Sequence, residues 1–173
     1  MAKCVVLVGL PAYGKSTYVN NLGPEEEFFV YSTDSYIEDL SEKTGKTYNE
    51  LFPDYIEKAK FRMDALLDLA VKEGVDVFWD QTNLSSWKRR SIIKRMKNAG
   101  YSVECVVFEP AMTEEGYDEW KKRLDSRKGK TIPESILDHM VYNFIKPSTK
   151  EGFDSVVIVQ NTFDPETTIV TGG

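Results

Sequence analysis

The segment "VGLPAYGKST", from Val8 to Thr17, constrains this chain more than any other stretch of its sequence. It matches G-x-x-x-x-G-K-[ST], a loop whose glycines let the backbone wrap closely around phosphate oxygens. A β-branched run precedes the motif and a helical pattern follows it, which is the context that the motif requires. The sequence therefore predicts a P-loop NTPase fold, with this segment joining the first strand to the first helix.

Each position of the loop has an expected part in nucleotide binding. Backbone N–H groups and the N-terminus of the following helix point at the phosphates. Lys15 supplies a positive charge for the β- and γ-phosphates, and the Ser16 hydroxyl is placed to ligate Mg²⁺. The residues that we expect to bind ATP here are Gly9, Leu10, Pro11, Ala12, Tyr13, Gly14, Lys15, Ser16 and Thr17.

Beyond the loop, apolar runs alternate with helical periodicity, which is typical of stacked βαβ units. Strands are predicted at 4–8, 28–32, 76–79, 102–108 and 155–159, and helices at 15–22, 35–43, 48–73, 86–99, 115–127 and 133–145. We expect a single α/β domain over 1–173, with three α/β/α layers, a parallel sheet of about five strands and a helical lid near 113–132. Gly23 and Pro24 end the first helix, and the tail 161–173 lacks a convincing period and is expected to be partly disordered.

The longest predicted helix, 48–73, contains Pro53, where a break is expected. Its predicted buried stripe consists of Ile56, Phe61, Leu66, Leu67 and Ala70. Cys4 and Cys105 lie in predicted buried strands as free thiols, and His139 is expected to be an ordinary helix residue. The start "MAKCVVLVG" is too short for a membrane span, so we expect a soluble, cytoplasmic protein without a membrane partner.

Charge is distributed unevenly along the chain. The net charge of −6 argues against a protein that coats nucleic acid. Two short windows are nevertheless basic, 88–97 and 121–130, and they hold 12 of the 22 Lys and Arg residues. They are either two solvated helix faces or two local anion-binding surfaces.

Two acidic residues bear on whether phosphate is hydrolysed or transferred. Asp80 follows the predicted strand at 76–79 and is expected to hold Mg²⁺ through water, but Gln81 follows it where motor ATPases commonly carry a second acid. In "STDSY", Asp34 lies at the carboxyl end of another strand, where it would orient an acceptor hydroxyl and take its proton late. Asp34 or Thr33 is equally consistent with a helix N-cap.

A second basic element has the character of a lid. Arg123 and Arg127 are four residues apart on a predicted helix, and "RKGKTIP" follows as a basic loop. We expect both arginines to contact ATP and Arg127 to neutralise charge on the transferred group. The alternative is a solvated helix face.

In combination, these motifs resemble the kinase domain of bacteriophage polynucleotide kinase and its P-loop relatives, over about residues 3–145. "STDSY" is similar to the segment that carries the acceptor-activating aspartate, "DQTNLSSWKRR" to a D-x-T-N segment followed by paired arginines, and "RLDSRKGKTIP" to the lid. The resemblance implies an ATP- and Mg²⁺-dependent kinase without the fused phosphatase domain. It implies Lys15, Asp34 and Arg127 as catalytic residues and a substrate-binding set of Asp34, Tyr36, Thr82, Asn83, Arg89 and Arg90.

One departure from the family pattern leaves the acceptor open. End-healing members carry an arginine three residues after the aspartate, and Ile37 stands there. A 5′-hydroxyl of DNA or RNA is the first choice of acceptor, and a hydroxymethyl group on a modified pyrimidine in phage DNA is the runner-up. Tyr36, Trp79 and Trp87 either stack on a base or pack in the core.

Two further function classes stay open at the level of sequence: a small-molecule kinase, favoured by the acidic pI, and a nucleotide-binding switch or ATPase without an acceptor. Oligomeric state is not determined by the sequence. The resemblance also implies a phage-infected host cell as the setting.

Overall fold

A single sheet organises the computed structural model, which describes residues 1–22, 27–110, 113–161 and 168–172. The strands of these residues follow the order β2-β3-β1-β4-β5-β6. Their bounds are β1 Lys3–Val8, β2 Phe28–Tyr31, β3 Asp76–Asp80, β4 Ser102–Glu109, β5 Ser155–Asn161 and β6 Thr168–Gly172. Strands β1 to β5 pair in parallel and β6 pairs antiparallel to β5. The predicted parallel sheet of five strands is confirmed.

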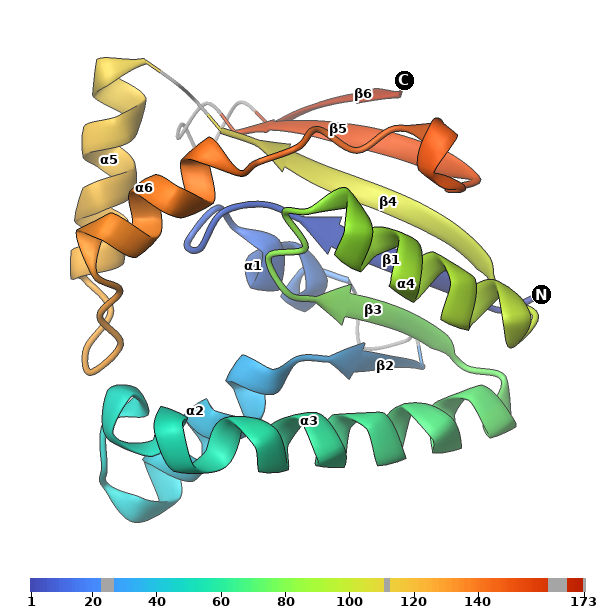
Figure 1. Ribbon diagram of the computed structural model, residues 1–173, viewed down its shortest axis with the longest axis horizontal. Helices are drawn as coiled ribbons and strands as arrows, with labels where there is room; N and C mark the ends of the chain where they lie inside the picture. Colours follow the sequence, from blue (N-terminus) through green and yellow to red (C-terminus); the bar gives the residue numbers. More distant parts are fainter. Residues whose placement is uncertain (23–26, 111–112, 162–167, 173) are drawn as a thin grey trace.

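Helices lie on both faces of this sheet and beyond the carboxyl ends of its strands (Figure 1). Their bounds are α1 Lys15–Asn20, α2 Thr33–Thr44, α3 Tyr48–Glu73, α4 Ser86–Asn98, α5 Glu114–Asp125 and α6 Glu134–Tyr142, with a short 3-10 helix η1 at Thr149–Glu151. Helices α3 and α4 pack on one face, and α1 packs on the other, together with the inner sides of α5 and α6. The fold is thus the three-layer α/β P-loop arrangement that the sequence predicts.

Alternation along β1 explains why the sheet is buried on both faces. Side chains point to opposite faces at successive strand positions. Cys4, Val6 and Val8 belong to the core shared with α3 and α4, whereas Val5 and Leu7 belong to the core shared with α1 and α5. Because β1 lies at the centre of the sheet, its carboxyl end and the loop that follows are held by packing from both sides.

Helix α3 differs from the prediction in two ways. It runs unbroken from Tyr48 to Glu73 through Pro53, which removes one backbone hydrogen bond without ending the helix. Its buried residues are Leu51, Ala59, Met63, Leu67 and Ala70. Phe61, which we expected in the stripe, is 78% exposed because it lies about 200° around the helix from Ala59.

The tail departs from the prediction as well. Thr168–Gly172, for which the sequence suggested no regular element, form the edge strand β6. The segment is rich in β-branched residues, which favour strands, and this signal was available in the sequence. Residues 162–167 and 173 lie outside the described residues, as does the predicted helix stop at Gly23 and Pro24.

Other sequence expectations concern single residues and the membrane. Cys4 and Cys105 are both buried and free, and burial raises the pKa of each thiol to about 12. His139 is exposed in the last turn of α6, as expected of an ordinary helix residue. Among the described residues, no helix has the length and apolar character needed to cross a membrane.

Candidate active site

The phosphate loop follows β1 and needs an unusual backbone. Ala12 and Gly14 have positive φ values of 61° and 89°, in the left-handed region. At Gly9, an added Cβ would lie 3.0 Å from the Phe108 Cβ, so the loop leaves no room for a side chain there. The Gly9 N–H donates to the Thr82 carbonyl at 3.0 Å, which ties the loop to the segment after β3. The two motif glycines are therefore required by conformation and by packing.

Lys15 opens α1 and turns its ammonium back over the loop. Its Nζ donates to the Gly9 and Leu10 carbonyls at 2.9 and 2.8 Å. Burial lowers the pKa of Lys15 to about 8, against the opposing effects of Asp80 and Asp34. At neutral pH such a group is mostly protonated, and an approaching anion raises its pKa further.

Ser16 and Asp80 face each other across the ends of α1 and β3. The Ser16 hydroxyl donates to Asp80 Oδ2 at 2.8 Å. Burial raises the pKa of Asp80, partly offset by this hydrogen bond and by Lys15. A hydroxyl and a carboxylate are oxygen donors of the kind that Mg²⁺ takes together with phosphate and water. The pair fits the predicted magnesium site, although no group of three His, Cys, Asp or Glu among the described residues forms a metal cage.

A cavity of about 540 Å³ opens beside the phosphate loop. Residues from the loop, the strand ends, α3 and the lid line it, among them Pro11, Ala12, Lys15, Ser16, Asp34, Tyr48, Asp80, Thr82, Lys88, Arg127 and Lys130. The wall formed by α3 and α6 is largely apolar, with Phe52, Ile56, Ile136 and Met140. The cavity therefore has a polar half at the phosphate loop and an apolar half at α3 and α6, and the apolar half could accept a partly apolar group.

Asp34 lies on the cavity wall in the first turn of α2. The helix N-cap is Ser32, whose hydroxyl accepts from the Ser35 N–H, so the reading of Asp34 or Thr33 as the cap is wrong. The Asp34 carboxylate instead accepts from the Tyr48 hydroxyl at 2.7 Å and from Lys130 Nζ at 2.7 Å. Burial alone would raise the pKa of Asp34, but Lys130, Tyr48 and Arg127 hold it below its ordinary value. The group is ionised at neutral pH, as a hydrogen-bond acceptor for a hydroxyl must be.

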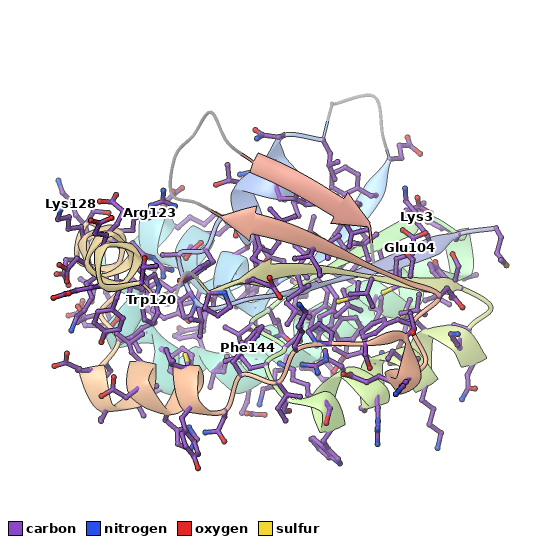
Figure 2. All side chains as sticks on the ribbon, turned by 90° about the horizontal axis from the view of Figure 1, so that it is seen from above. Lys3, Glu104, Trp120, Arg123, Lys128 and Phe144 are labelled. Atoms are coloured by element: carbon purple, nitrogen blue, oxygen red, sulfur yellow. The ribbon has the colours of Figure 1, made fainter. Side chains whose placement is uncertain are left out.

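The lid is attached to the phosphate loop through a tryptophan. Trp120 is 1% exposed on α5, its indole N–H donates to the Pro11 carbonyl at 2.6 Å, and its ring packs against Tyr13. In Figure 2, Trp120 lies on the side of α5 toward the sheet, while Lys128 lies at the outer rim. The lid helix is thus a direct neighbour of the loop that would hold phosphate.

The two predicted lid arginines do not share a helix face. Helix α5 ends at Asp125, so Arg127 lies in the loop that follows, where it lines the cavity at 3.8 Å from Glu38. Arg123 remains on α5, 3.9 Å from Glu119, and does not contribute to the cavity wall. Arg127 therefore lines the cavity that the phosphate loop also lines, whereas Arg123 is not among its lining residues.

Two predicted substrate-binding residues are structural. Asn83 is fully buried with a φ of 49°, and its amide donates to the backbone carbonyls of Leu7 and Gln81. Arg89 is also fully buried and forms a bidentate ion pair with Glu151 at 2.7 and 2.8 Å. Neither side chain lines the cavity: Asn83 joins the segment after β3 to β1, and Arg89 joins α4 to η1.

Of the other side chains predicted to contact the acceptor, some lie in the core and some on the surface. Tyr36 packs partly buried against the core, and Trp79 is buried and stacked on Tyr31. Arg90 and Trp87 are exposed on α4, and Trp87 is 81% exposed. Of the segment "DQTNLSSWKRR", the side chains on the cavity wall are Asp80, Gln81, Thr82 and Lys88. Of the predicted substrate-binding residues, Tyr36, Asn83, Arg89 and Arg90 thus do not line this cavity: Asn83 and Arg89 are buried, Tyr36 is partly buried and Arg90 is exposed.

Among the wall residues that were not predicted as site residues are Tyr48, Lys88 and Lys130. Lys130 and Lys88 belong to the two basic windows that the sequence singles out, and "RKGKTIP" placed Lys130 in the lid loop. The partner of Lys130 lies 96 residues away in sequence, so spacing along the chain gave no sign of the pair.

The basic windows are largely neutralised by acids nearby. Arg95 pairs with Asp64 and Asp68, and Lys97 pairs with Asp154. In the second window, Lys121 pairs with Glu134 and Lys122 lies 3.9 Å from Glu119. One lysine of each window lines the cavity: Lys88 from the first and Lys130 from the second. The windows are thus neither simple solvated faces nor simple anion-binding surfaces, since eight of their twelve basic residues are paired with acids of the described residues, Arg89 and Lys130 among them in the interior.

Comparison with known proteins places the chain among P-loop proteins. The sequence model of a family described as AAA domain, AAA_33, matches residues 4–147, which is most of the chain. The region matched runs from β1 to just beyond α6, and so includes the phosphate loop, Asp34 and the lid.

Solved structures share the fold at low sequence identity. A chain from the PezAT chromosomal toxin–antitoxin system of Streptococcus pneumoniae has a TM-score of 0.61 at 17% identity, covering 97% of this chain and 75% of that chain. Kti12 of Chaetomium thermophilum, solved with ADP-AlF3, has a TM-score of 0.61 at 15% identity, covering 94% and 91%. A sugar kinase from Janibacter sp. has a TM-score of 0.55 at 18% identity, covering 92% and 86%.

Proposed function

This chain belongs to the AAA domain family AAA_33, and we propose that it is an ATP-dependent kinase that transfers the γ-phosphate to a hydroxyl group of nucleic acid. The observation that carries the proposal is the position of Asp34. Its ionised carboxylate lies on the same cavity as Lys15, Ser16 and Arg127, and it is not used as a helix cap.

The donor half of the proposed site consists of the phosphate loop and its neighbours. Lys15 would move from the Gly9 and Leu10 carbonyls to the β- and γ-phosphates, and its charge would offset theirs. Ser16 and Asp80 would hold Mg²⁺, which, when bound, neutralises charge on the transferred group. Arg127 lines the same cavity, where its guanidinium would face the same group.

The acceptor half centres on Asp34. An alcohol has a pKa far above that of a carboxylate, so Asp34 would accept a hydrogen bond from the hydroxyl, orient it in line and take its proton late. Because Tyr48 and Lys130 already fix both carboxylate oxygens, the group has little freedom to rotate away from an incoming hydroxyl. Orientation of this kind is the main contribution available to a protein in phosphoryl transfer.

Nucleic acid is the acceptor class that the cavity wall supports best. Lys88 lies on this wall within electrostatic range of Asp34, where an acceptor phosphate would meet a cation. The apolar wall of Phe52, Ile56 and Ile136 suits the face of a nucleobase. The order of motifs also resembles polynucleotide kinases, and on this basis a 5′-hydroxyl end is our first choice.

A second acceptor is favoured by Ile37. This residue is fully buried with Leu51 and Ala59, so the position contributes packing and gives no charge to the cavity. A phosphate next to a 5′-hydroxyl therefore lacks the arginine that end-healing relatives carry at this position. The second candidate is accordingly a kinase for a hydroxymethyl group on a pyrimidine within DNA.

The test offers γ-labelled ATP with Mg²⁺ to the purified protein together with matched acceptors. These are a 5′-hydroxyl oligonucleotide, the same strand with a 5′-phosphate, a 5′-phosphorylated strand containing hydroxymethyluracil, and a panel of nucleosides and sugars. Label in the 5′-hydroxyl strand alone supports the first choice. Label in the blocked, modified strand supports the second.

Substitution of Asp34 separates transfer from mere nucleotide binding. Asp34→Asn should keep ATP affinity and reduce transfer about 10²-fold or more, the usual scale for a general base. Asp39→Asn, at an exposed acid on the same helix, is the matched control and should transfer normally. Label in small molecules only would overturn the nucleic-acid acceptor, and ATP turnover that no acceptor stimulates would overturn the kinase.

A further inference from the structure

Lys130 is a buried lysine whose ammonium ends on two carboxylates. Its side chain is 8% exposed, and Nζ lies 2.7 Å from Asp34 Oδ2 and 2.6 Å from Glu38 Oε1. The same nitrogen lies 4.2 Å from the centroid of the Tyr48 ring. Desolvating an ammonium is costly unless it is paired and hydrogen-bonded, and here two anions and a ring face surround it.

The backbone around Lys130 is fastened to the same region of the fold. The Asn49 N–H donates to the Gly129 carbonyl at 3.1 Å. The Asn49 side chain both donates to the Thr131 carbonyl at 2.9 Å and accepts from the Thr131 N–H at 3.0 Å. We call residues 129–131 the strap, because they join the loop after α5 to the N-terminal turn of α3.

Gly129 allows the strap to lie this close. Its φ is +71°, and an added Cβ would lie 2.9 Å from the Thr47 Cβ. A residue with a side chain would therefore be strained in conformation and would push the strap away from α3. The sequence "KGK" places the one residue type that fits directly before the lysine that reaches Asp34.

We propose that Lys130 is a positioning residue, which fastens the closed lid to the acceptor half of the site and fixes the Asp34 carboxylate for transfer. The inference rests on the proposed kinase function and adds to it a residue that no motif assigns. Opening the lid would take Lys130 away and leave Asp34 beside Glu38 without their shared cation. Closing the lid and fixing the Asp34 carboxylate in position would then occur together.

Titratable and charged groups on several elements face Asp34, and each of them affects its pKa. Lys130 and Arg127 come from the lid loop, Tyr48 from α3, Glu38 from α2, Lys88 from α4, and Lys15 and Asp80 from the donor half. Lys130 is the one cation with a hydrogen bond to the Asp34 carboxylate among the described residues. Removing its charge should therefore raise the pKa of Asp34, with Glu38 adding to the rise.

The experiment compares Lys130→Met with Lys130→Arg and with Lys128→Met, whose parent residue is exposed on the same loop. Carbon-detected NMR titration of the Asp34 carboxyl needs no turnover. Lys130→Met should raise its pKa by about one unit or more, the usual effect of an opposite charge at this distance. Lys128→Met should leave it unchanged, and Lys130→Arg should keep it near the wild-type value.

Two further measurements follow the lid and the reaction. In Lys130→Met, the amides of Asn49 and Thr131 should exchange faster with solvent, because the strap loses its side-chain anchor. The acid limb of the kcat–pH profile should move to higher pH, as the pKa of Asp34 rises, with a smaller change in KM for ATP. Lys130→Gln provides the same comparison if the Met variant does not fold.

An unchanged Asp34 titration in Lys130→Met would overturn the inference, as would an acid limb that stays in place although the titration moves. A merely structural role would change amide exchange and stability without moving the carboxyl titration. If the wild-type protein transfers no phosphate to any acceptor, the proposed kinase fails instead, and the NMR result still reports on the Lys130–Asp34 pair.

Discussion

At the scale of single residues, the lowered pKa of Lys15 links its protonation to nucleotide binding. Burial brings the pKa to about 8, so close to half of the side chains are neutral at pH 8. Phosphate beside the nitrogen favours the ammonium form and raises the pKa. Binding of ATP should therefore take up about half a proton per site at pH 8 and almost none at pH 6.

Titration calorimetry in two buffers with different ionisation enthalpies measures this uptake. Lys15→Arg is the matched control, since a guanidinium stays charged over this range and its binding should show no linked proton. Equal heats in both buffers at pH 8 for the wild-type protein would mean that Lys15 is charged before ATP arrives.

Residue roles were predictable where a local motif defines them. Lys15, Ser16 and Asp80 lie together as the loop pattern and strand order require. Asp34 reaches the cavity as predicted, but its partners Tyr48 and Lys130 come from distant segments. Such contacts depend on how helices close over the sheet, which the spacing of residues along the chain does not encode.

At the scale of elements, α4 and η1 are joined through the Arg89–Glu151 pair, with side chains 0% and 6% exposed. Arg89→Met would leave the Glu151 carboxylate buried without its cation, along with the Leu84 carbonyl that Arg89 also bonds. Breaking a buried pair in this way typically costs about 3–5 kcal/mol. Urea unfolding should show a loss of this size.

Arg90→Met is the matched comparison, because Arg90 is exposed one position further along α4. Its effect on the free energy of unfolding should stay within about 0.5 kcal/mol. A stable Arg89→Met protein with weakened acceptor binding would contradict the structural role and restore Arg89 to the substrate-binding set.

Element positions were predictable because their signals are local. Helix α3 starts with the Thr47–Glu50 capping box and ends at Gly74, and its predicted limits agree with the structure. Helix α5 was predicted to end two residues too late, which placed Arg127 on a helix face that it does not share. The exposed Phe61 shows the same limit, since hydrophobicity alone did not give the phase of the buried stripe.

At the scale of the whole molecule, net charge and local charge act in opposite directions on a polyanionic acceptor. The chain carries a formal charge of −6, with 22 basic and 28 acidic residues. Many surface cations are paired with acids, so the attraction for nucleic acid should come from a few residues at the cavity.

Salt dependence of acceptor binding measures how many phosphates are engaged. A single-stranded acceptor that neutralises three phosphates should give a slope of log K against log salt of about −2, and a small neutral acceptor almost none. Lys88→Gln should make the slope shallower by about 0.7. Lys72→Gln, at the far end of α3, is the control and should leave the slope unchanged.

A flat salt response with a nucleic-acid acceptor would mean that contacts other than phosphate hold it. The loop motif and the βα alternation were enough to predict the parallel sheet and the P-loop fold class, while the strand order comes from the structure. Recognition of the acceptor could not be predicted to the same degree, since Arg89 and Asn83 match the family motif and yet lie in the interior.

The lid makes contact with both halves of the site, through Trp120 at the phosphate loop and through Lys130 at Asp34. If bound phosphate donor raises the binding affinity of the acceptor by some factor, thermodynamic linkage requires that bound acceptor raise the affinity of the donor by the same factor. If the proposed kinase couples its two substrates through this connection, the synergy would be the same whichever substrate is added first. In the proposed kinase, neither substrate alone would hold the lid as firmly as the ternary complex, and loss of phosphate to water would be suppressed until both have arrived.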